Sequence, residues 1–339
     1  MASALDEGIW ASVDRILTAA EIDGIRFHKL GALAGRFRRR RGEAVPRALA
    51  ADERGAAVAM VISTPVLQRV RSACDGPIVL IKGPEVARLY PGQARVFGDL
   101  DVLVPEPPAV QQALKAAGFV EVGEFYEDAH HLRPLIFPGL GLKVEVHKRP
   151  SWPKRLASPS LDEILEAAVP CTCGVDGVVT PDARHHALIL AAHGWKENPL
   201  GTMRDLIDVA AVSAGIPEYD LDRAARAWGL GRVWTATRGT TEALLEGRSL
   251  SLPVRLWAGH LQSVRERTIV EGHLRGWLQG FWKLPPRLAL LDTRDAIRRE
   301  LLPGPEETWR DKLTRTADAV RHPRQPHSLH DEWPRRAAR

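Results

Sequence analysis

The stretch FGDLDVLV at residues 97–104 constrains the fold and chemistry of this chain more than any other. It predicts a short strand. Because side chains alternate along a strand, Asp99 and Asp101 share one face and the apolar residues beside them share the other. Neighbouring carboxylates repel each other, and burying either one without a compensating positive charge costs free energy. A divalent cation that prefers oxygen ligands, Mg²⁺ or Mn²⁺, would neutralise the charge of the two aspartates. The alternative is a solvated pair of aspartates at a strand edge.

Other apolar runs predict further strands around this one. The run Ile78 to Ile81 is too short for a helix and favours a buried strand, which the turn Lys82-Gly83-Pro84 ends. The sequence KVEVH alternates cleanly, so Lys143, Glu145 and His147 are expected on one face. The glycines just before it predict a hairpin. The remaining expected strands cover residues 119–122 and 131–137.

The rest of the chain shows helical spacing. Apolar residues recur at three- and four-residue intervals before residue 75 and again from about residue 160 onward. The fold class predicted is α+β, a small mixed sheet flanked by N-terminal helices and a C-terminal helical domain. The division predicted is an N-terminal helical segment (1–75), a catalytic core (76–152), a helical domain (153–302) and a basic, mobile tail (303–339).

The net charge indicates which kinds of ligand the chain could bind. The 339 residues include 47 basic and 42 acidic ones, a net charge of +5, and much of the excess lies among the arginines at 36–41 and in the tail. This balance suits an anionic substrate such as a nucleoside triphosphate (NTP), but it is too weak for a nucleic-acid groove. The arginine run itself is expected to be a solvated loop.

Localisation is predicted from what the sequence does not contain. Three cysteines make no disulfide framework, which favours a reducing compartment. The N-terminus has no secretory signal, and no apolar run is long enough to cross a bilayer. We therefore expect a cytoplasmic protein with no membrane partner.

Three predicted strands bring together the residues that could carry chemistry. Asp99, Asp101 and Glu145 on neighbouring strands can hold two cations about 3.5–4 Å apart, a spacing used in phosphoryl displacement. Asp99 and Asp101 would bridge the two cations, and Glu145 would bind only the one that polarises the acceptor. Lys82 and the backbone at Gly83 are placed to meet phosphate oxygens.

Further residues are expected to assist. Arg95 could pair with the β- or γ-phosphate, and Gly98, directly before Asp99, completes the expected nucleotide-binding set. His147 could orient Glu145 or the acceptor, or simply pack, and His131 lies in a loop or strand edge. Farther along, Arg204 and Asp208 are spaced for a structural i,i+4 ion pair.

This set of motifs resembles the polymerase-β-like nucleotidyltransferase superfamily, and most closely its bacterial group of uncharacterised nucleotidyltransferases. The resemblance covers most of residues 20–300. It rests on IVLIKGPEVARLYP (78–91), RVFGDLDVLV (95–104), HHL (130–132), VEVH (144–147) and AAHGWKENPLGTMRDLIDVA (191–210). At the phosphate turn the superfamily usually has Gly-Ser or Gly-Gly where this chain has Gly83-Pro84. Proline has no N–H, so phosphate binding must rely on Gly83, Lys82 or Arg95.

The resemblance implies metal-dependent transfer of a nucleoside monophosphate from an NTP such as ATP to an acceptor, with release of pyrophosphate. The acceptor would be a hydroxyl or phosphate of a peptide, protein or small molecule. One alternative is a glycosyltransferase that uses the D-x-D motif to hold a nucleotide sugar. That alternative predicts a nucleotide-binding α/β domain before the motif, where this chain looks helical. A third possibility is a non-catalytic module that binds nucleotides or partners.

Overall fold

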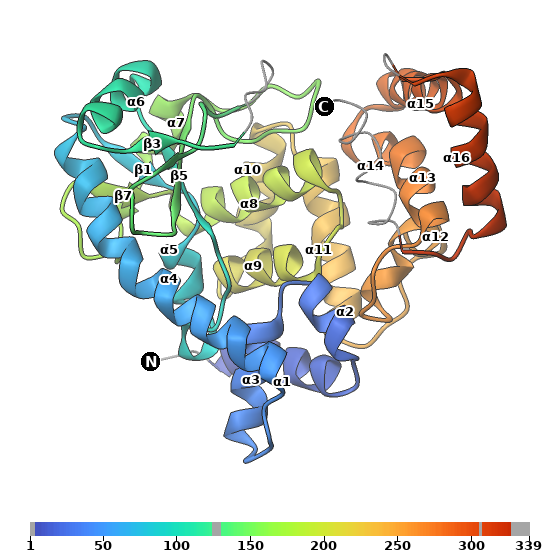
Figure 1. Cartoon of the computed structure of the whole chain (residues 1–339), viewed down its shortest axis with the longest axis horizontal. Coiled ribbons are helices and arrows are strands. Elements are labelled where there is room, and N and C mark those ends of the chain that lie inside the picture. Colours follow the sequence, from blue (N-terminus) through green and yellow to red (C-terminus); the bar gives the residue numbers. More distant parts are fainter. Residues whose placement is uncertain (1–3, 124–129, 305–306, 327–339) are drawn as a thin grey trace.

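The computed structural model describes residues 4–123, 130–304 and 307–326, and most of this part of the chain is helical, with helices on both sides of one small sheet (Figure 1). Within these ranges, no helix is long and apolar enough to cross a membrane. The sixteen α-helices of the described residues are α1 (Ala4–Thr18), α2 (Ile22–Phe27), α3 (Gly31–Arg40), α4 (Arg47–Ser72), α5 (Pro84–Ala87), α6 (Pro107–Ala116), α7 (Leu161–Glu166), α8 (Ala183–Glu197), α9 (Met203–Ser213), α10 (Glu218–Ala227), α11 (Gly231–Leu245), α12 (Leu252–Ala258), α13 (Ile269–Leu278), α14 (Gly280–Lys283), α15 (Pro286–Leu301) and α16 (Trp309–Arg321). Two short 3₁₀ helices are η1 (Pro91–Gln93) and η2 (Gly259–Leu261).

Seven short strands of the described chain form a single mixed sheet, in the order β3-β4-β5-β2-β1-β7-β6. These strands are β1 (Ile78–Leu80), β2 (Asp99–Leu103), β3 (Val120–Glu121), β4 (Leu135–Ile136), β5 (Lys143–His147), β6 (Val169–Pro170) and β7 (Val178–Thr180). The pairs β2–β5 and β1–β7 are parallel, and the other pairs are antiparallel. This architecture confirms the predicted α+β class, and the antiparallel β4–β5 pair confirms the predicted hairpin.

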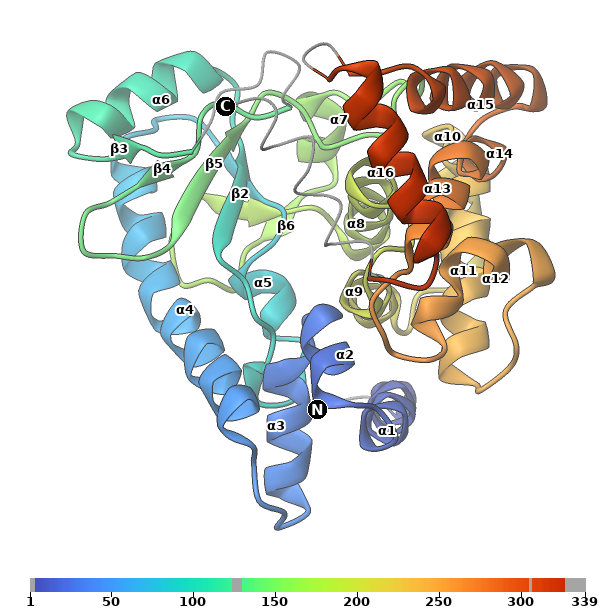
Figure 2. The same cartoon turned by 45° about the vertical axis from the view of Figure 1, so that its right-hand side comes forward.

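Different helices cover the two faces of the sheet, and alternation along β2 decides which face carries the acids. Leu100 and Val102 pack into a buried cluster with apolar residues of α4 and α6. Leu103 belongs to a second cluster that includes residues of α8 and α9. Because every second residue of a strand points the same way, Asp99 and Asp101 share the face of Leu103. The acids therefore lie on the face turned toward the helical half of the molecule (Figure 2).

Strands β6 and β7 lie in the region that the sequence predicted to be helical from about residue 160 onward. Strand β7 pairs in parallel with β1 through Val178 and Val179, so the sheet extends beyond residue 152. The expectation of helix from about residue 160 onward is therefore wrong at these two strands, and the residues after β7 are mostly helical as predicted. A strand of three residues is too short to show a period of two, which is why the pattern missed it. The division into four segments stays a prediction.

The segment predicted to be a mobile tail contains helix α16. Thr308 Oγ1 accepts a hydrogen bond from the Asp311 N–H at 3.2 Å, and the Asp311 carboxylate accepts one from the Thr308 N–H at 3.3 Å. This capping box satisfies N–H groups that the first turn of a helix leaves free. The spacing of Thr308 and Asp311 is the sequence signal that the prediction missed. Residues 327–339 of the tail lie outside the described residues.

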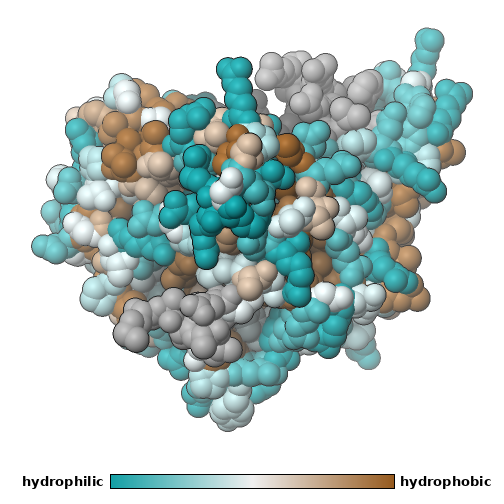
Figure 3. Space-filling model, turned by 90° about the horizontal axis from the view of Figure 1, so that it is seen from below, coloured by the Kyte–Doolittle hydropathy of each residue, from teal (hydrophilic) through white to brown (hydrophobic). Residues whose placement is uncertain are grey.

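Most of the basic run at 36–41 forms the last turns of α3, which ends at Arg40, and is not a loop. It lies where the α3–α4 hairpin projects at the bottom of Figure 1, and hydrophilic side chains face the viewer there in Figure 3. Arg39 Nη2 lies 2.8 Å from Glu53 Oε2, and Arg41 pairs with Glu43 and Asp14. Because nearby acids pair with several of these arginines, the run is a solvated, largely neutralised surface.

A buried ion pair joins the segment before β2 to helix α9. Arg95 Nε and Nη2 donate to the two carboxylate oxygens of Asp208 at 2.7 and 2.6 Å, and the two side chains are only 2% and 4% exposed. The Tyr90 hydroxyl donates to the same carboxylate at 2.6 Å. Burial opposes ionisation of Asp208, yet the charge and hydrogen bonds of Arg95 lower its pKa overall.

The predicted i,i+4 pair of Arg204 and Asp208 is therefore wrong. Arg204 Nη2 instead donates to Asp205 Oδ1 at 3.2 Å. The Asp208 carboxylate instead accepts hydrogen bonds from Arg95 and Tyr90. A contact between segments so far apart in the chain has no signature in local spacing.

The buried pair of Arg95 and Asp208 allows a test of how much this contact between the sheet and helix α9 contributes to stability. We expect Asp208→Ala to lower the free energy of unfolding by about 3–5 kcal/mol, because it leaves the Arg95 charge buried without a partner. The matched control is Asp220→Ala, which removes an exposed pair to Arg223 at 3.6 Å and should cost less than about 1 kcal/mol. Urea unfolding followed by circular dichroism measures both. Equal losses in the two variants would contradict the assignment.

Candidate active site

Two neighbouring parallel strands place the predicted acids side by side. Strands β2 and β5 pair with Asp101 opposite Glu145 and Leu103 opposite His147. Since alternation has the same phase on both strands, Asp101, Glu145 and His147 project from the sheet face that carries Leu103. The alternating pattern of KVEVH predicted this common face correctly.

Asp101, Glu145 and His147 form a compact group of possible metal ligands. One ligand atom from each lies within 4.8 Å of the others, and no other such group of three occurs in the part of the chain that the structure describes. His147 Nε2 lies 2.9 Å from Asp101 Oδ1 and 3.8 Å from Glu145 Oε2. Carboxylates suit Mg²⁺ and Mn²⁺, and imidazole suits transition metals. The donor set therefore fits a divalent cation.

Burial and neighbouring charges act differently on the two carboxyl groups. Burial raises the pKa of Glu145, and the charges of Asp101 and Asp99 raise it further, to about 7. Burial also opposes ionisation of Asp101, but the hydrogen bond and charge of His147, with the charge of Lys82, hold its pKa well below its usual value. Asp101 is thus a carboxylate at neutral pH, whereas Glu145 exchanges its proton near neutrality. A bound cation would favour the ionised form of Glu145.

Asp99 is the first residue of β2 and lies two residues before Asp101, on the same face. It is half-buried, and its charge acts on Glu145. The compact group of ligand atoms found among the described residues does not include it; His147 takes the third place instead. Metal binding by Asp99 therefore stays a prediction.

The turn at Lys82 and Gly83 passes close to the acids. The N–H of the residue before Lys82 donates to the Asp101 carbonyl at 3.0 Å. Burial lowers the pKa of Lys82, while the charge of Asp101 acts to raise it. Gly83 has φ +78°, and a Cβ there would lie 3.0 Å from a leucine side chain of β2 and 3.4 Å from the Asp99 carbonyl oxygen. Glycine is thus required for this close approach. Contact with phosphate stays a prediction for both residues.

Arg95 and Gly98 were also predicted to bind the nucleotide. Two of the three guanidinium nitrogens of Arg95 are engaged by Asp208. Its Nη1 is buried and has no hydrogen-bond partner in the described ranges. The Gly98 carbonyl accepts from the Lys143 N–H at 3.1 Å, which anchors the start of β2 to β5. Their contact with a nucleotide stays a prediction, and for Arg95 it depends on Nη1.

Four histidines cluster beside the acids. The His130 ring centroid lies 4.9 Å from that of His131, 5.0 Å from that of His147 and 6.3 Å from that of His193. His131 Nε2 lies 3.8 Å from Glu145 Oε2. The structure thus brings the predicted accessory residues His131 and His147 to the acids. His193, from α8, joins them from the helical half.

The N-terminal helices also reach this face, which the sequence did not predict. The charge of Arg204, followed by burial, lowers the pKa of Lys29, while Asp205 and Asp99 act in the opposite direction. The hydrogen bond of 3.2 Å from the Met203 N–H to the neighbouring His28 places Lys29, between α2 and α3, beside the start of α9. No local spacing predicts this contact, because it depends on how distant helices pack.

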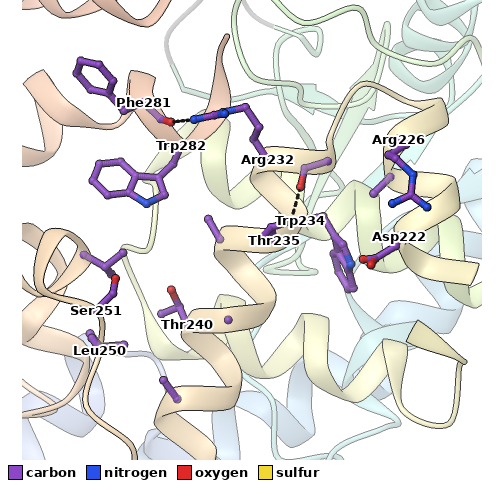
Figure 4. Close-up of a pocket in the computed structure, with 16 residues that line it drawn as sticks. Asp222, Arg226, Arg232, Trp234, Thr235, Thr240, Leu250, Ser251, Phe281 and Trp282 are labelled. Carbon is purple, nitrogen blue, oxygen red and sulfur yellow. Dashed lines mark hydrogen bonds between the residues drawn. The ribbon is translucent and has the colours of Figure 1, made fainter. Parts of the chain in front are cut away.

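A separate cavity lies in the helical half (Figure 4). It has a volume of about 700 Å³, lies between α10, α11, α12 and α14, and is lined by residues that include Arg226, Trp234 and Trp282. Arg232 donates to the Phe281 carbonyl beside it. It holds none of the predicted site residues, so the acid cluster and this cavity are distinct features.

Comparison with known families agrees with this geometry. A family model described as "Uncharacterised nucleotidyltransferase" matches residues 9–246, which run from α1 to just past the end of α11. The matched span covers more than half of the chain and includes every predicted site residue. A search of curated proteins and a search of solved structures each return no match.

The raised pKa of Glu145 predicts how cation binding depends on pH. A cation must displace the Glu145 proton, so we expect Mn²⁺ affinity to rise about tenfold per pH unit up to about pH 7 and then to level off. Glu145→Gln should bind weakly and lack this dependence. The exposed Glu106 offers a control, since Glu106→Gln should behave like the unaltered chain. Calorimetric titration at several pH values measures this, and an affinity that does not change with pH in the unaltered chain would refute it.

Proposed function

The chain belongs to the family of uncharacterised nucleotidyltransferases, and we propose that it moves a nucleoside monophosphate from an NTP to an acceptor and releases pyrophosphate. The acceptor group is a hydroxyl or phosphate of a peptide, protein or small molecule. The proposal further names Mg²⁺ or Mn²⁺ as the cation, ATP as one donor and the cytoplasm as the location. The observation that carries it is the convergence of Asp101, Glu145 and His147 beside the Lys82–Gly83 turn.

The acids would hold the cation, and His147 would position one of them. Asp101 is ionised, and its Oδ1 accepts a hydrogen bond from His147 Nε2, because an ionised carboxylate can only accept. This bond fixes the orientation of the carboxylate. Glu145 loses its proton near neutrality and adds a second negative ligand. When bound, a divalent cation neutralises phosphate charge and activates the acceptor oxygen.

The surrounding cations support binding of a phosphate chain at the same place. Lys82 follows β1 at the acid cluster, and the open backbone at Gly83 lies against β2. Transfer of a nucleotidyl group needs little covalent chemistry from the protein, because positioning and charge neutralisation do most of the work. A set of acids faced by lysine and arginine side chains meets that need.

Two alternatives predict different structures. A D-x-D glycosyltransferase would carry a nucleotide-binding α/β domain before the motif, but residues 4–77, all of them described, contain α1 to α4 and no strand (Figure 1). A non-catalytic module has no need of Asp101 and Glu145 at close range, since their repulsion is costly without a cation. Both observations favour the nucleotidyltransferase.

The proposal is tested with α-labelled NTPs. We expect label to appear in an acceptor, with release of pyrophosphate, and we expect Asp99→Asn and Asp101→Asn each to lower turnover by at least about a hundredfold, because each removes a negative ligand. Intact mass measurement of candidate acceptors identifies the adduct. Nucleotide sugars serve as competing donors in the same assay.

The matched control is Asp176→Asn, which neutralises an exposed acid in the turn before β7. It should turn over like the unaltered chain. Circular dichroism checks that the Asp99 and Asp101 variants remain folded. Full turnover by both variants, or glycosyl transfer in place of nucleotidyl transfer, would refute the proposal.

A further inference from the structure

We infer that Lys29, Arg204 and the free nitrogen of Arg95 form a binding site for the triphosphate tail of the donor nucleotide, next to Asp99. The inference deepens the proposed function and rests on it. It assigns the N-terminal helices a part in substrate binding that the sequence motifs do not reveal.

The packing of α2 fixes Lys29 against the start of α9. The neighbouring His28 is fully buried, and its Nδ1 accepts a hydrogen bond from the Met203 N–H at 3.2 Å. Its ring stacks on His260 at 5.7 Å. Within α2 itself, a Cβ on Gly24 would lie 1.7 Å from the Val264 carbonyl oxygen, so the helix packs directly on backbone there. Lys29 is thus held beside the first turn of α9, where Arg204 lies.

The backbone of Lys29 adopts a conformation that favours glycine. Its φ is +57°, and its N–H donates to the Arg26 carbonyl at 2.9 Å as α2 ends. A left-handed residue in this position is most often glycine, because a Cβ is strained there. A long cationic side chain kept in such a conformation indicates a role for that side chain.

The two arginines keep donors that lack partners. Arg204 donates through Nη1 to the Val96 carbonyl at 3.4 Å and through Nη2 to Asp205, but its Nε is buried without a hydrogen-bond partner among the described residues. Arg95 is only 2% exposed, and its Nη1 is likewise unpartnered there. Buried donors normally have partners, so these two indicate a ligand with acceptor oxygens.

Charge identifies the ligand as a polyanion. The Arg204 charge is the largest influence on the pKa of Lys29 and lowers it, which is the effect of a facing cation. Asp208 and Asp205 already pair with Arg95 and Arg204, so the groups offered to an anion are the Lys29 ammonium, Arg95 Nη1 and Arg204 Nε. A triphosphate carries several negative charges and many acceptor oxygens, and guanidinium groups match phosphate geometry. Its tail would run from the acids past Asp99 to Lys29.

The experiment uses Lys29→Gly, with inorganic tripolyphosphate as the probe in calorimetry without added metal. We expect about tenfold weaker binding than for the unaltered chain. Because glycine suits the left-handed backbone, the melting temperature should stay the same or rise. Lys29→Arg should retain most of the affinity. The control is Arg26→Ala on the preceding helix α2, which removes an exposed side chain that pairs with Asp52 at 3.1 Å. This variant should bind the probe like the unaltered chain.

Two outcomes overturn the inference: Lys29→Gly binds tripolyphosphate as tightly as the unaltered chain, or Arg26→Ala weakens it equally. Failure of the proposed function shows separately. In that case the unaltered chain transfers no label from α-labelled NTP, whatever the tripolyphosphate measurements give. If the chain transfers label, and Lys29→Gly changes neither the KM for NTP nor the affinity for tripolyphosphate, the inference about this binding site is wrong and the proposed function stands.

Discussion

The repulsion between Asp101 and Glu145 is the constraint around which this structure is arranged. Parallel pairing of β2 with β5 sets the two carboxyl groups opposite each other, and burial strengthens their interaction by excluding water. The chain itself offers partial relief through His147, Lys82 and a proton held on Glu145 near neutrality. A divalent cation meets the same need more fully. The acids therefore fit a positive ion, and we propose that the surrounding lysine and arginine side chains bind a negative ligand.

Residues from the helical half and from the N-terminal helices lie around the acids that the sheet carries. Asp208 of α9 engages Arg95 just before β2, and His28 next to Lys29 bonds to the first residue of α9. Helix α9 thus contacts both segments that flank the acid face. His193 of α8 and the two histidines before β4 lie beside His147 and Glu145. The site is a composite of segments from most of the span matched by the family.

Local patterns predicted the parts of this site that depend on alternation within one strand. FGDLDVLV and KVEVH correctly placed the acids and His147 on one face, and the glycine at 83 was correctly assigned to a turn. The parts that depend on contacts between distant segments were not predicted. Arg95 pairs with Asp208, Lys29 approaches Arg204, and β7 joins β1, and none of these contacts leaves a periodic pattern. Strand β7 and the cap of α16 were missed because each signal spans only three or four residues.

The pairing of β1 with β7 has a consequence for how the chain is made. Asp99, Asp101 and Glu145 have all been synthesised once residue 147 is added, but the outer edge of β1 stays unpaired until residue 178 follows. An open strand edge is a template for pairing with other chains, and long-range pairings form slowly. The nascent protein thus passes through an interval in which β1, β2 and β5 have been synthesised while one edge of β1 is still unpaired. Residues 76–152 expressed alone would lack β7, so this edge of β1 would stay unpaired, and we expect the fragment to self-associate.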